Sequence, residues 1–120
     1  MSNQIDSKLR AKILSEALPY MQEYKDKFMV VKYGGHAMIN DTLSDTFAQN
    51  MVMLKHAGMH PIIVHGGGPQ IGENLKMQGV ESKFYDGLRI TDKETIKVVE
   101  KVLFEILNKK IVKTIEKFHG

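Results

Sequence analysis

Apolar positions recur along the chain with two different spacings, and the changes in spacing mark out its elements. Residues 4–25 carry apolar side chains mostly four positions apart, which predicts one amphipathic helix. Its apolar stripe consists of Ile5, Leu9, Ile13, Ala17, Tyr20 and Tyr24. Pro19 lies inside this pattern and has no backbone N–H, so we expect a kink there or two helices that meet.

Two short apolar runs, each closed by glycines, have the composition of buried strands. The first is Phe28–Tyr33, followed by two glycines, and the second is Pro61–His65, followed by three. Runs that are apolar on both faces are typical of parallel strands covered on both sides. Both runs are therefore predicted to lie inside a parallel sheet.

Each predicted strand is followed by a helical pattern. One helix is capped by Asp41 or Ser44 and runs to about His56, and the next runs from Pro69 to Gly79. Their inward side chains are predicted to be Phe47, Met51 and Leu54, then Ile71 and Leu75. This βαβα order predicts a parallel sheet with right-handed crossovers.

The pattern changes at residues 80–90. Alternation around the pair Asp86-Gly87 predicts a β-hairpin. Thr91 and Glu94 then have the spacing of a capping box, which predicts the start of a long helix. Its inward residues are predicted to be Ile96, Val99, Leu103, Ile106 and Leu107, with Ile111 and Ile115 beyond them.

Composition narrows the function classes. A net charge of +3 is mild, and because the lysines are interleaved with acids we expect a solvated surface and no nucleic-acid footprint. The absence of cysteine excludes disulfides and a thiol nucleophile. We find neither a signal-peptide pattern nor an apolar run of membrane-spanning length, so the expected location is cytoplasmic, with no membrane partner.

The glycine clusters are the first candidate for chemistry. Ligands of open α/β sheets bind at the carboxyl ends of the strands, where backbone N–H groups and a helix N-terminus attract anions. The dinucleotide fingerprint is excluded because Ile71 stands where its third glycine belongs, and the Walker pattern is excluded because Glu73 replaces its lysine. A phosphate site is favoured. The alternative is a tight strand-to-helix turn with no ligand.

Two cations flank these clusters. Lys32 ends the first strand, where its ammonium could neutralise a phosphoryl group during transfer, or could simply extend into solvent. Arg89 follows the hairpin turn. Its planar fork suits a carboxylate, although an ion pair with Asp86 or Asp92 is an equally local explanation.

The stretches "VVKYGGHAM", "PIIVHGGGPQI" and "DGLRITD", in this order and spacing, resemble the amino acid kinase family over essentially the whole chain. Within it they are most similar to the members that phosphorylate N-acetyl-L-glutamate in arginine biosynthesis. The resemblance implies a three-layer α/β/α sandwich with a mostly parallel sheet. Its N-terminal lobe holds the acceptor and its C-terminal lobe holds ATP, with Mg²⁺ held mainly by the nucleotide phosphates and no metal site on the protein.

The same resemblance assigns roles to residues of this chain. Lys32 is the catalytic lysine that stabilises the transferring phosphoryl group. The phosphate-binding backbone is that of Gly34, Gly35 and Gly66. The acceptor is bound by Gly67 and Gly68, with its α-carboxylate held by Arg89. The implied reaction transfers the γ-phosphoryl group of ATP to the side-chain carboxylate, giving N-acetyl-glutamyl 5-phosphate.

Arginine-inhibited members of the family carry a kinked helix before the first strand. Residues 1–27 resemble that element and residues 28–120 the acceptor lobe, which implies a hexamer joined through the helices and L-arginine as an inhibitor, with Tyr20 as a candidate effector residue. The alternative is a helix that packs on its own domain.

Two departures from the family pattern leave other functions open. His36 replaces a small or amide residue and is interpreted as a solvent-facing loop histidine, or else as part of the acceptor site. The residues of the ATP lobe are absent from residues 1–120, so this chain alone is expected to be inactive. A non-catalytic oligomerising or regulatory module is one alternative, and a related kinase that forms acyl phosphates on another acceptor is a second.

Overall fold

The computed structural model describes residues 6–120, apart from the side chains of Gly35 and His36. The predicted positions of Ile5 and of those two side chains lie outside the described residues. The elements, in order, are α1 (Ser7–Tyr24), β1 (Phe28–Tyr33), the 3₁₀-helix η1 (Gly35–Met38), α2 (Asp41–His56), β2 (His60–His65), α3 (Gly68–Met77), β3 (Phe84–Tyr85), β4 (Leu88–Arg89), α4 (Lys93–Glu100), the π-helix η2 (Lys101–Asn108) and α5 (Lys109–Glu116).

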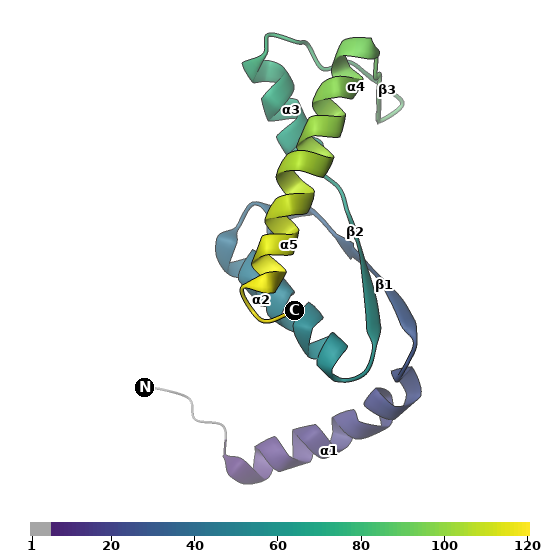
Figure 1. Cartoon of the computed structure of the whole chain (residues 1–120), viewed down its shortest axis with the longest axis vertical. Helices are drawn as coiled ribbons and strands as arrows, with labels where there is room; N and C mark the ends of the chain where they lie inside the picture. The colour runs from purple at the N-terminus through teal and green to yellow at the C-terminus, as the bar shows by residue number, and fades with distance from the viewer. Residues whose placement is uncertain (1–5) are drawn as a thin grey trace.

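The two apolar runs form a parallel pair, as predicted. Phe28 lies opposite His60 and the register continues to Tyr33 opposite His65. Just beyond the pair, the Gly66 amide donates to the Tyr33 carbonyl over 3.2 Å. Both glycine clusters therefore leave the sheet at the same edge (Figure 1).

Only one face of this sheet is covered by the described helices. Burial alternates along β1, from Tyr33 at 3% exposed to Phe28 and Val30 at 75% and 72%. The mixed α/β class with a parallel sheet is confirmed, but the prediction that both faces of β1 are buried is wrong here. Strand composition reports what a face can tolerate, whereas burial needs a second layer to cover it.

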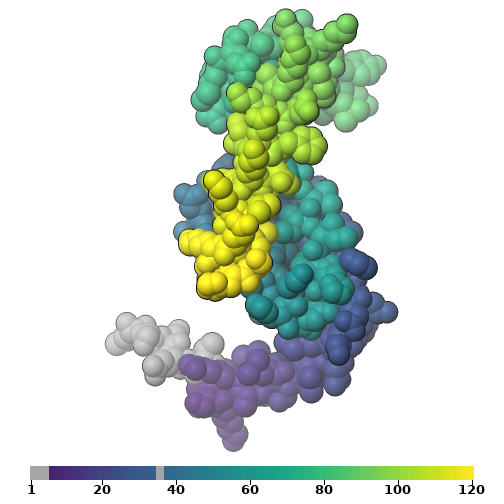
Figure 2. Space-filling model, in the orientation of Figure 1, coloured from purple at the N-terminus to yellow at the C-terminus, as the bar shows by residue number. Residues whose placement is uncertain are grey.

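The last helix connects the two halves of the core. It runs from α4, which packs on α3, through η2 to α5, which packs on α2 (Figures 1 and 2). The buried cluster consists of Tyr33, Met38, Ile71, Leu75, Val98, Val102 and Leu107. Packing of distant elements along one helix gives the core an elongated shape.

The predicted inward face of this helix is partly wrong. Leu107 is buried, and Val99 and Leu103 pack against the core, but Ile96 and Ile106 are 50% and 42% exposed. In α4 the buried residues lie one position away from the predicted stripe. In η2 the wider turn, with hydrogen bonds five residues apart, rotates the face away from a 3.6-residue pattern.

Neither helix is capped by the residue that the sequence predicted. The Asn40 side chain accepts from the Leu43 amide at 3.0 Å and caps α2, in place of Asp41 or Ser44. The Asp92 carboxylate accepts from the Thr95 amide at 2.8 Å and caps α4, in place of Thr91. Neighbouring polar residues compete for this role, and only backbone geometry selects one.

The predicted turns are confirmed. Gly58 and Gly79, which follow α2 and α3, have φ values of 88° and 70°, in the left-handed region that ends helices. Asp86 and Gly87 also have positive φ, 48° and 75°, and join β3 to β4 as a two-residue hairpin.

α1 is one helix, with Pro19 inside it, and not two helices that meet. None of its residues is buried, and it extends from the body beside the start of β1 (Figures 1 and 2). The alternative of a helix packed on its own domain is therefore not supported. Within residues 6–120, every helix is too short or too polar to cross a membrane.

Candidate functional site

The outer glycines of the loops leave open space. A Cβ built on Gly34, Gly66 or Gly68 would meet no atom within 4 Å, and none of these residues has φ in the left-handed region. Neither strain nor packing therefore demands glycine at these positions. Bare backbone that faces open space is what close approach of a ligand needs.

The middle glycine has a different reason. A Cβ on the buried Gly67 would lie 2.6 Å from Leu107 Cδ1 and 2.8 Å from Leu103 Cδ2. Gly67 thus lets the loop pack directly against η2. Sequence reasoning assigned this glycine to the ligand alone and missed the packing, because its partners lie about 40 residues further along the chain.

The second loop opens α3. This helix begins at Gly68 and has Pro69 in its first turn, where the missing proline N–H has no intrahelical partner to lose. The free N–H groups of the first turn and the helix dipole favour an anion at this end. The loop and the helix terminus together offer backbone donors at the sheet edge.

Arg89 lies at this helix terminus. One guanidinium nitrogen donates to Ser82 Oγ and another donates to the Gly68 carbonyl over 3.2 Å. The guanidinium also lies over the Phe84 ring, 4.7 Å from its centroid. Among residues 6–120 it forms no ion pair with Asp86 or Asp92, so the local explanation for this arginine is not supported.

Lys32 lies at the same edge of the sheet, on the uncovered face. It pairs in register with Val64, two residues before the second glycine loop. Its side chain is exposed, so the idea of a lysine inside a buried run is wrong for these residues. In the described part of the chain it makes no ion pair, which leaves its ammonium available to an anion bound beside the loops.

Two residues that support the loops were missed. The Tyr33 hydroxyl donates to the Ala37 carbonyl at 2.9 Å, just after the first loop, and His65 Nδ1 lies 2.9 Å from the Gly66 carbonyl. Both end a strand on its covered side. The available signal was their position immediately before the glycines.

The remaining predicted residue stays apart. Tyr20 is 64% exposed on α1, which joins the sheet at the edge opposite the glycine loops. No group of three His, Cys, Asp or Glu side chains within residues 6–120 could hold a metal ion. The structure thus gathers Lys32, both glycine loops and Arg89 at one edge of the sheet.

The chain is similar in sequence to one protein family and to named members of it. The model of the amino acid kinase family matches residues 27–118. Over 118 residues the chain is 53% identical to the acetylglutamate kinase of Chromohalobacter salexigens, covering 98% of this chain and 39% of that protein. Over 111 residues it is 57% identical to the acetylglutamate kinase of Zymomonas mobilis, covering 92% and 37%.

A solved structure shares the fold. The N-acetylglutamate synthase of Neisseria gonorrhoeae, solved with coenzyme A and N-acetyl-glutamate, superimposes with a TM-score of 0.70 at 19% identity, covering 92% of this chain and 25% of that one. The chain spans about two fifths of the length of the curated relatives it matches, 37–39%.

Proposed function

This chain belongs to the amino acid kinase family, and from that premise we propose that it provides the acceptor-binding part of an acetylglutamate kinase. The proposed reaction breaks the bond between the γ-phosphorus of ATP and its bridging oxygen. A new bond forms to a side-chain carboxylate oxygen of N-acetyl-L-glutamate, and ADP leaves. Identities of 53% and 57% to proteins named acetylglutamate kinase support this acceptor.

The observation that carries the proposal is the contact of Arg89 with the first turn of α3, 3.2 Å from the Gly68 carbonyl. A carboxylate placed here meets a guanidinium and the positive end of a helix together. We assign this place to the α-carboxylate of the acceptor. Gly68 then contacts the acceptor with the open side of its Cα, where no other atom lies within 4 Å. At Gly67 that side packs on η2, so Gly67 contacts the acceptor through its peptide groups.

The phosphoryl group is proposed to pass beside Lys32, between the two loops. Gly34, Gly35 and Gly66 supply backbone donors, and the lysine ammonium stabilises the charge that develops during transfer. Mg²⁺ is proposed to arrive on the nucleotide phosphates. Positioning and charge stabilisation suffice for this chemistry, so no covalent enzyme intermediate is needed.

The test is acceptor specificity in the complete protein that carries this sequence. With ATP and MgCl₂, hydroxylamine traps an acyl phosphate as a hydroxamate, and N-acetyl-L-glutamate, L-glutamate, N-acetyl-L-aspartate and N-acetyl-L-aminoadipate are compared. We expect kcat/KM to be about tenfold or more higher for N-acetyl-L-glutamate, since one methylene group discriminates by that order. A preference for aminoadipate would identify a related kinase. If none of the four acceptors gives hydroxamate, the protein is a non-catalytic module.

Assembly and regulation form a second part of the proposal. We propose that α1 joins copies into a hexamer, that L-arginine inhibits the enzyme near Tyr20, and that the protein works in the cytoplasm in arginine biosynthesis. The exposure of Leu9, Ile13, Tyr20 and Tyr24 along the apolar stripe of α1 supports the assembly role. Inhibition of hydroxamate formation by L-arginine but not D-arginine would support the regulatory role.

A further inference from the structure

Tyr33 lies between the catalytic candidate Lys32 and Gly34 in the sequence. Its side chain lies on the covered face of β1, opposite to the face that carries Lys32. Successive strand side chains point to opposite faces, so the exposed Lys32 and the buried Tyr33 share one segment of backbone. The Tyr33 ring stacks on Phe47 with centroids 3.9 Å apart and planes within 8°. The end of β1 is therefore anchored in the core directly beneath the lysine.

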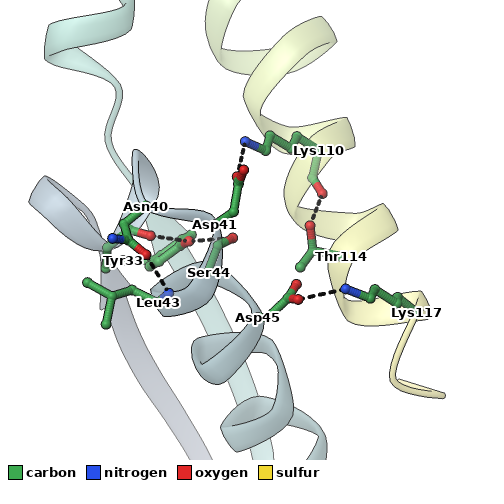
Figure 3. Close-up of polar contacts among 10 residues, drawn as sticks. Tyr33, Asn40, Asp41, Leu43, Ser44, Asp45, Lys110, Thr114 and Lys117 are labelled. Carbon is green, nitrogen blue, oxygen red and sulfur yellow. Dashed lines mark hydrogen bonds and ion pairs between the residues drawn. The ribbon is translucent and has the colours of Figure 1, made fainter.

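The Tyr33 hydroxyl makes two polar contacts in this buried place. It lies 2.9 Å from the Ala37 carbonyl. It also lies 3.0 Å from Ser44 Oγ, on the first turn of α2 (Figure 3). A carbonyl can only accept, so the tyrosine proton goes to Ala37, and the serine hydroxyl can donate to the tyrosine oxygen. Ala37 belongs to η1, which continues the first glycine loop, and Ser44 belongs to the first turns of α2.

The loop itself holds little that would fix it. No atom within 4 Å would meet a Cβ on Gly34, and glycine backbone has the greatest conformational freedom of any residue. Electrostatic catalysis needs donors that are already aimed before the charge develops. A hydrogen bond from the core to the far end of the loop can supply that preorganisation.

We propose that Tyr33 is a positioning residue of the phosphoryl-transfer site. Its hydroxyl holds η1 at Ala37 and thereby fixes the backbone amides of the first glycine loop and the strand end that carries Lys32. This inference rests on the proposed function for its kinetic consequence. Its structural consequence, a fixed loop, can be measured without any activity.

The test compares Tyr33→Phe with Ser44→Ala in the complete protein. Tyr33→Phe keeps the stacked ring and removes both contacts, whereas Ser44→Ala keeps the Tyr33–Ala37 hydrogen bond. Amide hydrogen exchange across Gly34–Met38 should be about three- to tenfold faster in Tyr33→Phe, the factor expected for one lost neutral hydrogen bond. In Ser44→Ala we expect exchange within about twofold of wild type.

Kinetics separate positioning from stability. In Tyr33→Phe we expect kcat to fall about three- to tenfold, while KM for both substrates stays within about twofold, since the loop acts on the transferring group. Unchanged exchange and kcat with a lower Tm would overturn the proposal, because the hydroxyl would then be structural only. Equal effects of the two variants would also overturn it. If the wild-type protein phosphorylates nothing, the proposed function fails, and the exchange rates alone decide whether Tyr33 fixes the loop.

Discussion

At Gly67 a single methyl group would enter space that η2 already fills. Its carbon would lie 2.6 Å from Leu107 Cδ1 and 2.8 Å from Leu103 Cδ2. Leucine methyls can rotate, but both would have to move together. We expect Gly67→Ala to lower the free energy of unfolding by about 1–3 kcal/mol, as overpacked cores do, measured by urea denaturation.

Gly68 provides the matched control, because a Cβ there would meet no atom within 4 Å. Gly68→Ala should unfold at the same urea concentration as wild type or slightly above it. It should nevertheless raise KM for N-acetyl-L-glutamate about tenfold or more, since a side chain would displace an acceptor held by bare backbone. If Gly68→Ala leaves this KM unchanged, the assignment of Gly68 to the acceptor is wrong.

Arg89 offers a test of shape as well as charge. Lysine keeps the positive charge but cannot bond a carboxylate through two parallel N–H groups. We expect Arg89→Lys to raise KM for the acceptor about tenfold or more, because a charge-assisted hydrogen bond contributes roughly 1.5–3 kcal/mol, while KM for ATP stays the same. Ser82→Ala removes a residue that only orients the guanidinium, so its effect on KM should be smaller. Steady-state kinetics with each substrate varied in turn measures both.

At the scale of elements, the start of α4 depends on Asp92. The Thr95 amide donates to this carboxylate and lowers the pKa of Asp92 below its ordinary 3.8. A carboxyl whose pKa is lower in the folded state contributes stability above its unfolded pKa, and that stability is lost as pH falls through the folded value. Asp92→Ala should therefore lower Tm at pH 7, and the difference from wild type should shrink below about pH 4.

Two variants sharpen this prediction. Asp92→Asn keeps an acceptor for Thr95 without a charge, so its Tm difference from wild type should be smaller than that of Asp92→Ala. Thr91→Ala removes only a hydroxyl that donates to the Arg89 carbonyl, and its Tm should fall less than that of Asp92→Ala. If Thr91→Ala had the larger effect, the capping box predicted from the sequence would describe α4 better than the structure does.

The elements themselves could be predicted because their signals are local. Alternation, 3.6-residue spacing and the turn pair Asp86-Gly87 act over a few residues, and the structure has strands, helices and a hairpin where they predict them. The position of Arg89 beside Gly68 could not be predicted, since the two are 21 residues apart and meet only through the fold. The predicted inward face of η2 was wrong for another reason. A π-turn changes the helical period, and no residue in the stretch marks that change.

At the scale of the whole molecule, the chain is less compact than its length allows. The Cα radius of gyration is 18.8 Å, against about 14 Å for a compact domain of this size. The uncovered sheet face presents Phe28 and Val30 beside Ile62 and Val64, all at least 46% exposed. The apolar composition of both faces of the strands predicted a layer over this face, and the described residues do not supply one. Whether a layer is present depends on residues outside the strands.

The helix α1 also presents apolar residues to solvent, because none of its residues is buried. Leu9, Ile13 and Tyr20 are 48%, 50% and 64% exposed along one stripe. If this stripe joins copies of the protein, Leu9→Glu combined with Ile13→Glu should lower the molar mass of the complete protein in light scattering after gel filtration. Buried carboxylates without partners are too unfavourable for an interface to keep.

The control substitutes the opposite face of the same helix. Gln22 lies about half a turn from the stripe by the 3.6-residue repeat, so Gln22→Glu adds a charge that should leave the molar mass unchanged. Because no α1 residue is buried, Tm of the dissociated form should depend little on either variant. If the double substitution keeps the full molar mass, α1 does not carry the assembly. The acceptor site proposed at the other edge of the sheet would then stand without it, since Lys32, Arg89 and the glycine loops make no use of α1.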